Sequence, residues 1–304
     1  MNYRRSAKNL YTYFCRYYSQ KLGDRPADFT YRSLCSLKFI KEHGYYPRFK
    51  KPRSFSEKIW HRMLFDRSPI WTEISDKLKA RELVKEKVGE NFLPAILWQG
   101  ERPEEIPFAE LPDRFVIKTN HGAGYNVIVT NKKNLEHSRV LRRINDWLNL
   151  NFTYATFVGM AWAYKNIYPR VYVESFLGQA EKPPLDYKFF CFSGRVEYLQ
   201  ISFDRFGDAS ERILDRNFNV LDIYNGVRLY DGPIKRPENY EEMIRVAETL
   251  SAGFDFIRVD LYNVNGKIYF GELTCYPAGG LAAFVPRKWD FIFGEKWILE
   301  NKYK

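Results

Sequence analysis

The sequence predicts an α+β fold built around antiparallel sheets. Patterns typical of helices and strands are mixed along the 304 residues but do not alternate regularly, as a doubly wound parallel sheet would require. Two pairs of apolar and aromatic runs are joined by short turn sequences, Ser193-Gly194 and Asn265-Gly266, and each pair indicates a β-hairpin. A chain of this length can bury a large core, and its 17% of aromatic residues suits one.

The first elements along the chain are expected to be helices. Ser54 and Glu57 have the spacing of a capping box, so one helix should begin directly after Ser54. Its apolar residues recur at helical spacing: Ile59, Trp60, Met63 and Leu64. A second helix is expected to begin near Ser75, a good N-cap, and to end at Gly89. Residues 91–113 are rich in proline and are expected to form a loop.

Strands prevail after residue 113. Runs of β-branched and aromatic residues predict strands over 114–118, 126–130, 170–177, 186–192, 196–202, 256–262 and 267–274. Helices are expected over 134–150 and 238–251. The first of these has apolar residues at helical spacing: Val140, Leu141, Ile144 and Leu148.

The net charge of +11 is concentrated at the N-terminus. Residues 1–53 hold 13 Lys and Arg against 3 Asp and Glu, with tyrosines and phenylalanines interspersed. This pattern fits an interfacial helix on an anionic membrane surface, or a basic helix whose aromatic side packs on the main domain. Nucleic acid is not an expected partner, because the sequence shows no helix-turn-helix, zinc-finger or RNA-binding motif.

Composition argues against several other classes of protein. No apolar run approaches the ~18 residues of a membrane span, and no signal peptide is visible. The cysteines and histidines are scattered, without the spacing of metal ligands. We therefore expect reduced cysteines and a cytoplasmic protein, with a peripheral position at the inner face of the membrane as a further option.

The hairpin over 256–274 carries Arg258, Asp260 and Glu272. A two-residue type I′ turn at Asn265-Gly266, followed by regular pairing, would send Glu272 to the apolar face, where an unpaired carboxylate is costly. A three-residue loop with a left-handed bulge at Gly266 instead puts Arg258 opposite Glu272, with Asp260 on the same face. We predict this bulged loop. The other face then holds core residues, namely Ile257, Val259, Leu261 and Leu273. A surface Arg–Glu pair is the alternative to a metal site.

Two lysines are candidates for phosphate contacts. Lys118 ends a strand and is followed by the small-residue loop His121–Gly124, whose backbone N–H groups could surround phosphate oxygens. Lys77 lies in the first turn of the second helix, where anions are favoured. A plain hairpin loop and a solvated lysine are the structural alternatives.

Two further segments place charges on strands. Glu174 interrupts the apolar run VYVESFL. This run could act as a hinge whose backbone bonds the edge of an adenine, with Glu174 accepting from the adenine amino group. Alternatively, it could be an edge strand with one solvated carboxylate. Asp186 and Lys188 alternate, which puts both on one face of their strand.

In this order along the chain, the candidates resemble the ATP-grasp superfamily of carboxylate–amine ligases. The closest resemblance is to its TupA-like branch, associated with teichuronopeptide and other surface-polysaccharide synthesis. It is carried by KPRSFSEKIW, DKLKAR, FVIKTNHGAGYN, VYVESFL, DYKFFCFSG and RVDLY…GELTCYPAGG. It implies two α+β subdomains that grip ATP under a mobile lid. The implied parts are a basic helical region at 1–53, a helical and linker part at 54–113, the lid subdomain at 114–175 and the catalytic subdomain at 176–304.

The resemblance also implies roles for individual residues. The ATP-binding residues would be Lys77, Lys118, His121, Gly122, Gly124, Glu174, Ser175, Phe176 and Asp186. Arg258 and Lys188 would be catalytic, and Asp260, Glu272 and Thr274 would bind one or two Mg²⁺ ions. Gly279 and Gly280 would offer backbone N–H groups to the substrate. Thr274 departs from the family, which usually has asparagine there, and a hydroxyl is a weaker ligand for a second ion.

The implied reaction is an ATP-dependent amide synthesis through an acyl phosphate. The carboxylate would belong to a uronic-acid sugar or an amino acid of a surface polysaccharide, and the amine to an amino acid. Two alternatives remain: a kinase that phosphorylates a sugar hydroxyl, and a weakly catalytic nucleotide-binding scaffold for polysaccharide assembly.

Overall fold

The computed structural model describes residues 29–155, 161–178, 184–204 and 207–299, and within them two antiparallel-rich sheets form the framework. The first sheet has the order β1-β4-β2-β3, with bounds Ile96–Gly100, Val171–Ser175, Phe115–Thr119 and Asn126–Val129. The second has the order β10-β9-β5-β6-β7-β8, with bounds Lys267–Thr274, Phe256–Val264, Asp186–Phe192, Arg195–Phe203, Ser210–Asp215 and Arg228–Leu229. The predicted α+β class is confirmed.

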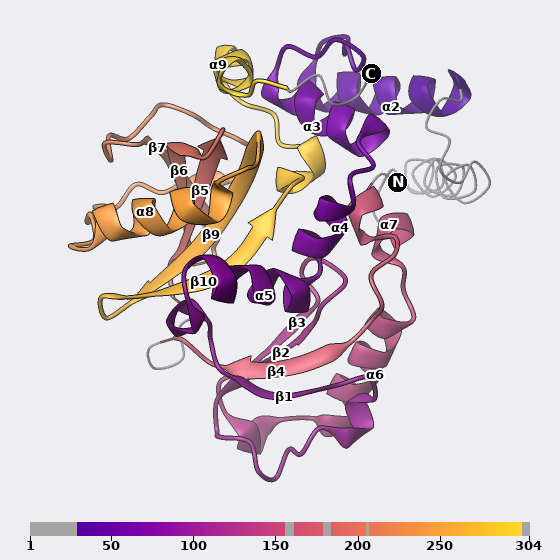
Figure 1. Cartoon of the computed structure of the whole chain (residues 1–304), viewed down its shortest axis with the longest axis vertical. Helices are drawn as coiled ribbons and strands as arrows, with labels where there is room; N and C mark the ends of the chain where they lie inside the picture. The colour runs from indigo at the N-terminus through magenta and orange to yellow at the C-terminus, as the bar shows by residue number, and fades with distance from the viewer. Residues whose placement is uncertain (1–28, 156–160, 179–183, 205–206, 300–304) are drawn as a thin grey trace.

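Helices connect and cover the two sheets (Figure 1). Their bounds are α2 Phe29–His43, α3 Phe55–Phe65, α4 Pro69–Ser75, α5 Lys77–Lys87, α6 His137–Leu148, α7 Phe152–Ala155, α8 Tyr240–Ser251 and α9 Lys288–Lys296. Figure 1 shows α5 between the sheets, α6 beside the first sheet and α8 on the outer side of the second. Elements from both halves of the sequence therefore meet around α5.

Each sheet has a core of its own. In the first, Val140, Ile144 and Trp147 of α6 are buried against apolar residues of β2 and β4. The larger core lies beside the second sheet and includes the predicted apolar face of α3, where Ile59, Trp60, Met63 and Leu64 are all buried. The predicted capping box at Ser54 and Glu57 forms, with both reciprocal hydrogen bonds present.

Part of the basic N-terminal region packs on this larger core. Cys35 and Phe39 of α2 are fully buried, and the Phe39 ring meets Trp60 edge to face with centroids 5.5 Å apart. Residues 1–28 lie outside the described part of the chain, so membrane contact through them stays a prediction. Among the residues that the structure describes, no helix has the length and apolarity to cross a membrane.

The start of α5 differs from the prediction. Ser75 is the last residue of α4, and Asp76 is the N-cap of α5, where its side chain accepts from the N–H of Leu78 at 3.0 Å. Asp76 also accepts from Asn120 Nδ2 at 3.0 Å. The chain bends at Asp76, whose extended backbone separates the end of α4 from the start of α5. The Asp76 carboxylate is therefore the group that caps α5.

We expect Asp76→Ala to lower the free energy of unfolding by about 1 kcal/mol, since a helix cap is lost. Ser75→Ala is the matched control, one residue away, and should cost less. Denaturant unfolding followed by circular dichroism measures both. If Ser75→Ala lowers the free energy of unfolding more than Asp76→Ala does, then Ser75, and not Asp76, caps the helix.

The expected loop over 91–113 is wrong in part. It contains β1, which pairs with β4 antiparallel and has a register shift between Ile96 and Trp98. The proline content hid this strand because Pro94 and Pro103 fall just outside it. As a result β4 is an interior strand, and the predicted alternative of an edge strand at Glu174 is also wrong.

The predicted turn of the β9–β10 hairpin is wrong as well, and so is the predicted pairing of Arg258 with Glu272, because Arg258 pairs with Thr274. The expectation that Asp260 and Glu272 share a face is nevertheless confirmed. Asn265 and Gly266 both have positive φ and form a two-residue turn, which pairs Val264 with Lys267. The bulge lies later, at Gly271: Phe270 pairs with Leu261, but Glu272 pairs with Asp260. This extra residue returns Glu272 to the face that carries Asp260. The opposite face is buried as predicted, at Ile257, Val259, Leu261 and Leu273.

Candidate nucleotide and metal site

A cavity of about 320 Å³ lies between the two sheets. Its walls come from β2, β3 and the end of β4 on one side, and from β5, β6, β9 and β10 on the other. Many of the predicted site residues line it: Lys77, Lys118, Gly124, Glu174, Ser175, Phe176, Asp186, Asp260 and Glu272. Apolar side chains line it as well, including Val116, Ile128, Leu177 and Leu185. A cavity with apolar walls and a few convergent charges is typical of a small-molecule site.

The second sheet contributes a compact charged cluster. Arg258 Nε and Nη2 donate to the two carboxylate oxygens of Asp260, each at 2.6 Å, and Nη2 donates to Glu272 Oε1 at 3.1 Å. Thr274 Oγ1 accepts from Arg258 Nη2 and donates to Glu272 Oε1, both at 3.1 Å. The predicted convergence of these four side chains is therefore present.

Electrostatics in this cluster favour a bound cation. Asp260 is 2% exposed, and burial raises the pKa of its carboxyl to about 7; Arg258 opposes this, while Asp186 and Glu272 raise it further. Burial alone would lower the pKa of Arg258, but the carboxylates of Asp260 and Glu272 raise it overall. Additional positive charge beside Asp260 would offset the crowding of carboxylates.

The donor set fits Mg²⁺. Within the described ranges, no group of three or more His, Cys, Asp or Glu is arranged to hold a metal ion. Two carboxylates from register partners, Asp260 and Glu272, are nevertheless present. Mg²⁺ is commonly held by one or two carboxylates together with waters and phosphate oxygens, so this set suits a metal that arrives with a nucleotide.

The two predicted phosphate lysines approach the cavity from opposite elements. Lys77 begins α5, and its Nζ donates to the carbonyl of Gly122 in the loop after β2. Burial lowers the pKa of Lys77, Glu272 raises it, and Lys118 lowers it. Lys118 lies on β2, and its Nζ forms an ion pair with Glu174. The glycine loop is thus held against α5, while Gly124 itself lines the cavity.

Glu174 lies near the end of β4 in the cavity wall, just before Ser175, Phe176 and Leu177. It is 5% exposed and contacts Arg81 as well as Lys118. The N–H of Ser175 donates to the carbonyl of Ala95, the residue before β1, at 2.9 Å, so this N–H already has a partner within the protein. Phe176 lies beyond the end of β4 and lines the cavity, which leaves its backbone outside the ladder.

Lys188 lies in a polar network rather than in the cavity wall. Its Nζ donates to Ser202 Oγ and to Glu211 Oε1, the latter at 3.2 Å, and lies 3.6 Å from Asp186 Oδ2. Glu211 also accepts from Gln200 Nε2. The reasoning from sequence missed Gln200, Ser202 and Glu211. Alternation along 196–202 could have placed Gln200 and Ser202 on one face, but the partner strand that holds Glu211 was not predicted.

Besides Gly122, Lys188, Arg258 and Thr274, three more predicted residues are absent from the cavity lining. His121 is buried, its Nε2 lies 2.9 Å from the carbonyl of Trp147, and burial lowers its pKa. The N–H of Gly279 donates to the carbonyl of Tyr276 at 2.9 Å. The carbonyl of Gly280 meets Trp60 Nε1 and His43 Nε2, each at 2.8 Å. In this structure their polar contacts are with other parts of the protein.

The fold and the ordered site define an ATP-grasp protein. More narrowly, the chain belongs to the family described as TupA-like ATPgrasp, whose profile matches residues 57–298. The match includes every candidate residue from Lys77 to Gly280. A search of curated proteins found no match.

Solved structures with a similar arrangement include ATP-grasp ligases. One is D-alanine–D-alanine ligase from Bacillus anthracis complexed with ATP: 13% identity, 74% of this chain and 62% of that chain covered, TM-score 0.42. Another is L-amino acid ligase from Bacillus licheniformis: 15% identity, 68% and 44% covered, TM-score 0.44. A third is the ATP-grasp ligase PsnB with minimal precursor, Mg and ADP: 16% identity, 72% and 57% covered, TM-score 0.39. The chain thus spans less than two thirds of the length of each of these proteins.

Proposed function

We propose that this protein is an ATP- and Mg²⁺-dependent carboxylate–amine ligase. The observation that carries the proposal is the single cavity that joins Lys77 and Lys118 to Asp260 and Glu272. Two lysines and a metal-binding carboxylate pair are the groups needed to position a triphosphate and to offset its charge during phosphoryl transfer. Family membership supports the same class of chemistry.

The proposed position of the adenine base is beside the apolar lining residues Val116, Ile128 and Phe176, where Glu174 supplies an acceptor for the 6-amino group. The backbone of Phe176 and Leu177 is the natural partner for the base edge, since the N–H of Ser175 already pairs with β1. The triphosphate then extends toward Lys77, Lys118 and the carboxylates of the second sheet.

The reaction proposed at the other end has two steps. A substrate carboxylate oxygen attacks the γ-phosphorus of ATP and ADP leaves, giving an acyl phosphate; an amine nitrogen then attacks the acyl carbon, loses a proton and releases phosphate. Arg258, which is buried and permanently charged, stabilises negative charge on the transferring group. Mg²⁺, when bound, supplies positive charge beside the phosphate oxygens. Lys188 lies on β5 opposite Asp260 and adds a second cation on this face.

The substrates proposed are a carboxylate of a uronic-acid sugar or peptide in a bacterial surface polysaccharide, and the amine of an amino acid. The support is the TupA-like family, together with the basic N-terminal region of 1–53, which suits a peripheral contact with an anionic membrane or polymer. Of that region, residues 29–43 form α2 on the main core.

Release of ADP and phosphate that depends on both an acid and an amine is the expected result. We would incubate the full chain with Mg-ATP and a panel of uronic acids and amino acids, and identify products by mass spectrometry. A gain of the amine with loss of one water confirms a ligase. A phosphorylated sugar without any need for amine would instead identify a kinase, and binding of Mg-ATP with no turnover over the whole panel would favour a scaffold.

A further inference from the structure

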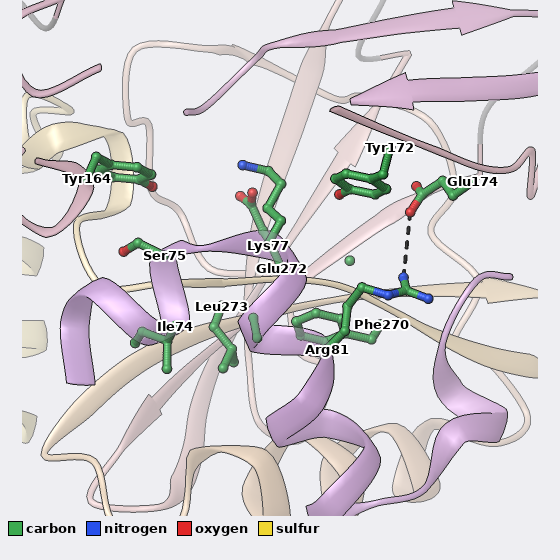
Figure 2. Close-up of a pocket in the computed structure, with 12 residues that line it drawn as sticks. Ile74, Ser75, Lys77, Arg81, Tyr164, Tyr172, Glu174, Phe270, Glu272 and Leu273 are labelled. Carbon is green, nitrogen blue, oxygen red and sulfur yellow. Dashed lines mark ion pairs between the residues drawn. The ribbon is translucent and has the colours of Figure 1, made fainter. Parts of the chain in front are cut away.

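Glu174 lies between two cations that belong to different pockets. One carboxylate oxygen contacts Lys118, which lines the large cavity. The other lies 3.7 Å from Arg81 Nη1, in a smaller pocket that also contains Tyr172 and Phe270 (Figure 2). Arg81 is not part of the lining of the large cavity. The two pockets adjoin, because Lys77, Glu174, Gly271 and Glu272 line both, but Arg81 lines only the smaller one and meets Glu174 from that side.

Arg81 also contacts the segment that leads into β1, beside the end of β4. Its Nη2 donates to the carbonyl of Pro94, and the carbonyl of the next residue, Ala95, accepts from the N–H of Ser175. The Arg81 side chain is 13% exposed, so these contacts are largely shielded from water. One side chain thus links α5 directly to Glu174 of β4 and to the segment before β1 that pairs with Ser175.

Lys77 and Arg81 are four residues apart in α5, which puts them one above the other on one side of the helix. Figure 2 shows both side chains projecting from α5 toward the first sheet, Lys77 beside Glu272 and Arg81 toward Glu174. The helix α5 therefore carries both Lys77, at the proposed phosphate end of the cavity, and Arg81, which contacts Glu174 at the proposed base end.

Lys118 and Arg81, the two cations that contact Glu174, would respond differently to a bound nucleotide. In the proposed complex Lys118 would turn from Glu174 to a phosphate oxygen, which leaves Arg81 as the remaining cation paired with Glu174 among the described residues. A buried carboxylate without a cation is costly. Pairing with Arg81 holds the Glu174 carboxylate in place as an acceptor, which suits the 6-amino group of adenine and repels the 6-oxygen of guanine.

We propose that Arg81 is a positioning residue that sets the preference for an adenine base by holding Glu174 from behind. It acts through Glu174 and does not touch the nucleotide. This inference rests on the proposed nucleotide site, and it adds a residue to which no role has been assigned.

The test compares Arg81→Met, Arg81→Lys and Arg139→Met in the full chain. Arg139 is a matched control, because it pairs with Glu136 at the same N–O distance of 3.7 Å but is 79% exposed. Calorimetry with Mg²⁺ present measures the dissociation constants of ATP and GTP. We expect Arg81→Met to weaken ATP binding about tenfold with little change for GTP, in line with the loss of a hydrogen-bonded charge. Arg81→Lys should restore much of the preference, and Arg139→Met should have no effect.

Where a turnover assay is in place, the loss in Arg81→Met should fall on KM for ATP and not on kcat. Equal weakening of ATP and GTP, or an unchanged ATP preference, would overturn the inference. If Arg81→Met does not fold, Arg81→Gln replaces it in a double-mutant cycle with Glu174→Gln. A residue that acts through Glu174 should show no further effect of Arg81→Gln in the Glu174→Gln background, and additive effects overturn the inference. Failure of the unaltered protein to bind ATP would contradict the proposed function itself, which separates the two outcomes.

Discussion

Asp260→Asn should abolish turnover, with a fall in kcat of about 10³-fold or more. The substitution keeps the shape of the side chain but removes the charge that offsets Arg258 and that would hold a cation. Removing one electrostatic group at a transition state commonly costs about 10²–10³-fold, and here a metal ligand is lost in the same step. Glu272→Gln, at the register partner of Asp260, should act in the same direction. Phosphate release measures turnover, and Mn²⁺ titration followed by electron paramagnetic resonance measures cation binding directly.

The control for this prediction is Asp231→Asn. Asp231 also pairs with an arginine, Arg212, at 3.2 Å, but it is 83% exposed and lies away from the cavity lining. Its substitution should leave kcat and Mn²⁺ binding unchanged. Circular dichroism and thermal unfolding check that Asp260→Asn is folded. Retained turnover and retained Mn²⁺ affinity in both Asp260→Asn and Glu272→Gln would rule out the metal assignment.

Gly271→Val should strongly reduce both stability and activity. A Cβ at Gly271 would lie 3.0 Å from the carbonyl oxygen of Asp260 and 3.1 Å from the ring of Tyr262. The carbonyl belongs to an interior strand that is paired on both sides, so it has little freedom to move away. Overpacking of this kind costs about 1–3 kcal/mol, and any repair by loss of the bulge would turn Glu272 toward the core. We expect at least a tenfold loss of kcat/KM, by analogy with other misplaced catalytic groups.

Lys267→Val is the matched control, because it introduces the same residue at an exposed position of the same strand. It should leave both the midpoint of unfolding and kcat/KM nearly unchanged. Denaturant unfolding and steady-state kinetics are measured for both variants. If Gly271→Val matches Lys267→Val in both measurements, the bulge at Gly271 does not position Glu272.

Much of the candidate site could be predicted from local sequence. Arg258 and Asp260 are two residues apart in a strand, so alternation alone puts them on one face, and the same holds for Asp186 and Lys188. Their order along the chain pointed to a nucleotide site, and the cavity brings together most of the residues so identified. The buried faces of α3 and β9 also followed from periodicity, as did Val140 and Ile144 of α6. The third buried residue of α6 is Trp147, while Leu141 and Leu148 are only partly buried.

The location of the bulge could not be predicted in this way. Bringing Glu272 to the face of Asp260 requires one extra residue in the hairpin, and both Gly266 and Gly271 can supply it, but only a bulge at Gly271 pairs Asp260 with Glu272. The deciding factor is the close approach of Gly271 to the carbonyl of Asp260, which is a contact across the sheet. The partners of Lys188 and Glu174 were missed for a similar reason. Glu211 and Arg81 come from elements whose neighbours in space are far away in sequence.

The sequence by itself determined which side chains carry charge, which of them share a face of a strand, and which class of protein their order resembles. Those properties depend on neighbours two to four residues away, where backbone geometry sets the direction of each side chain. The tertiary structure alone decided that Arg258 also lies against Glu272, that Glu174 is held by Arg81 and Lys118, and that the N–H of Ser175 is already used. These are contacts between segments up to about a hundred residues apart, and burial makes each of them strong enough to set the geometry of the site.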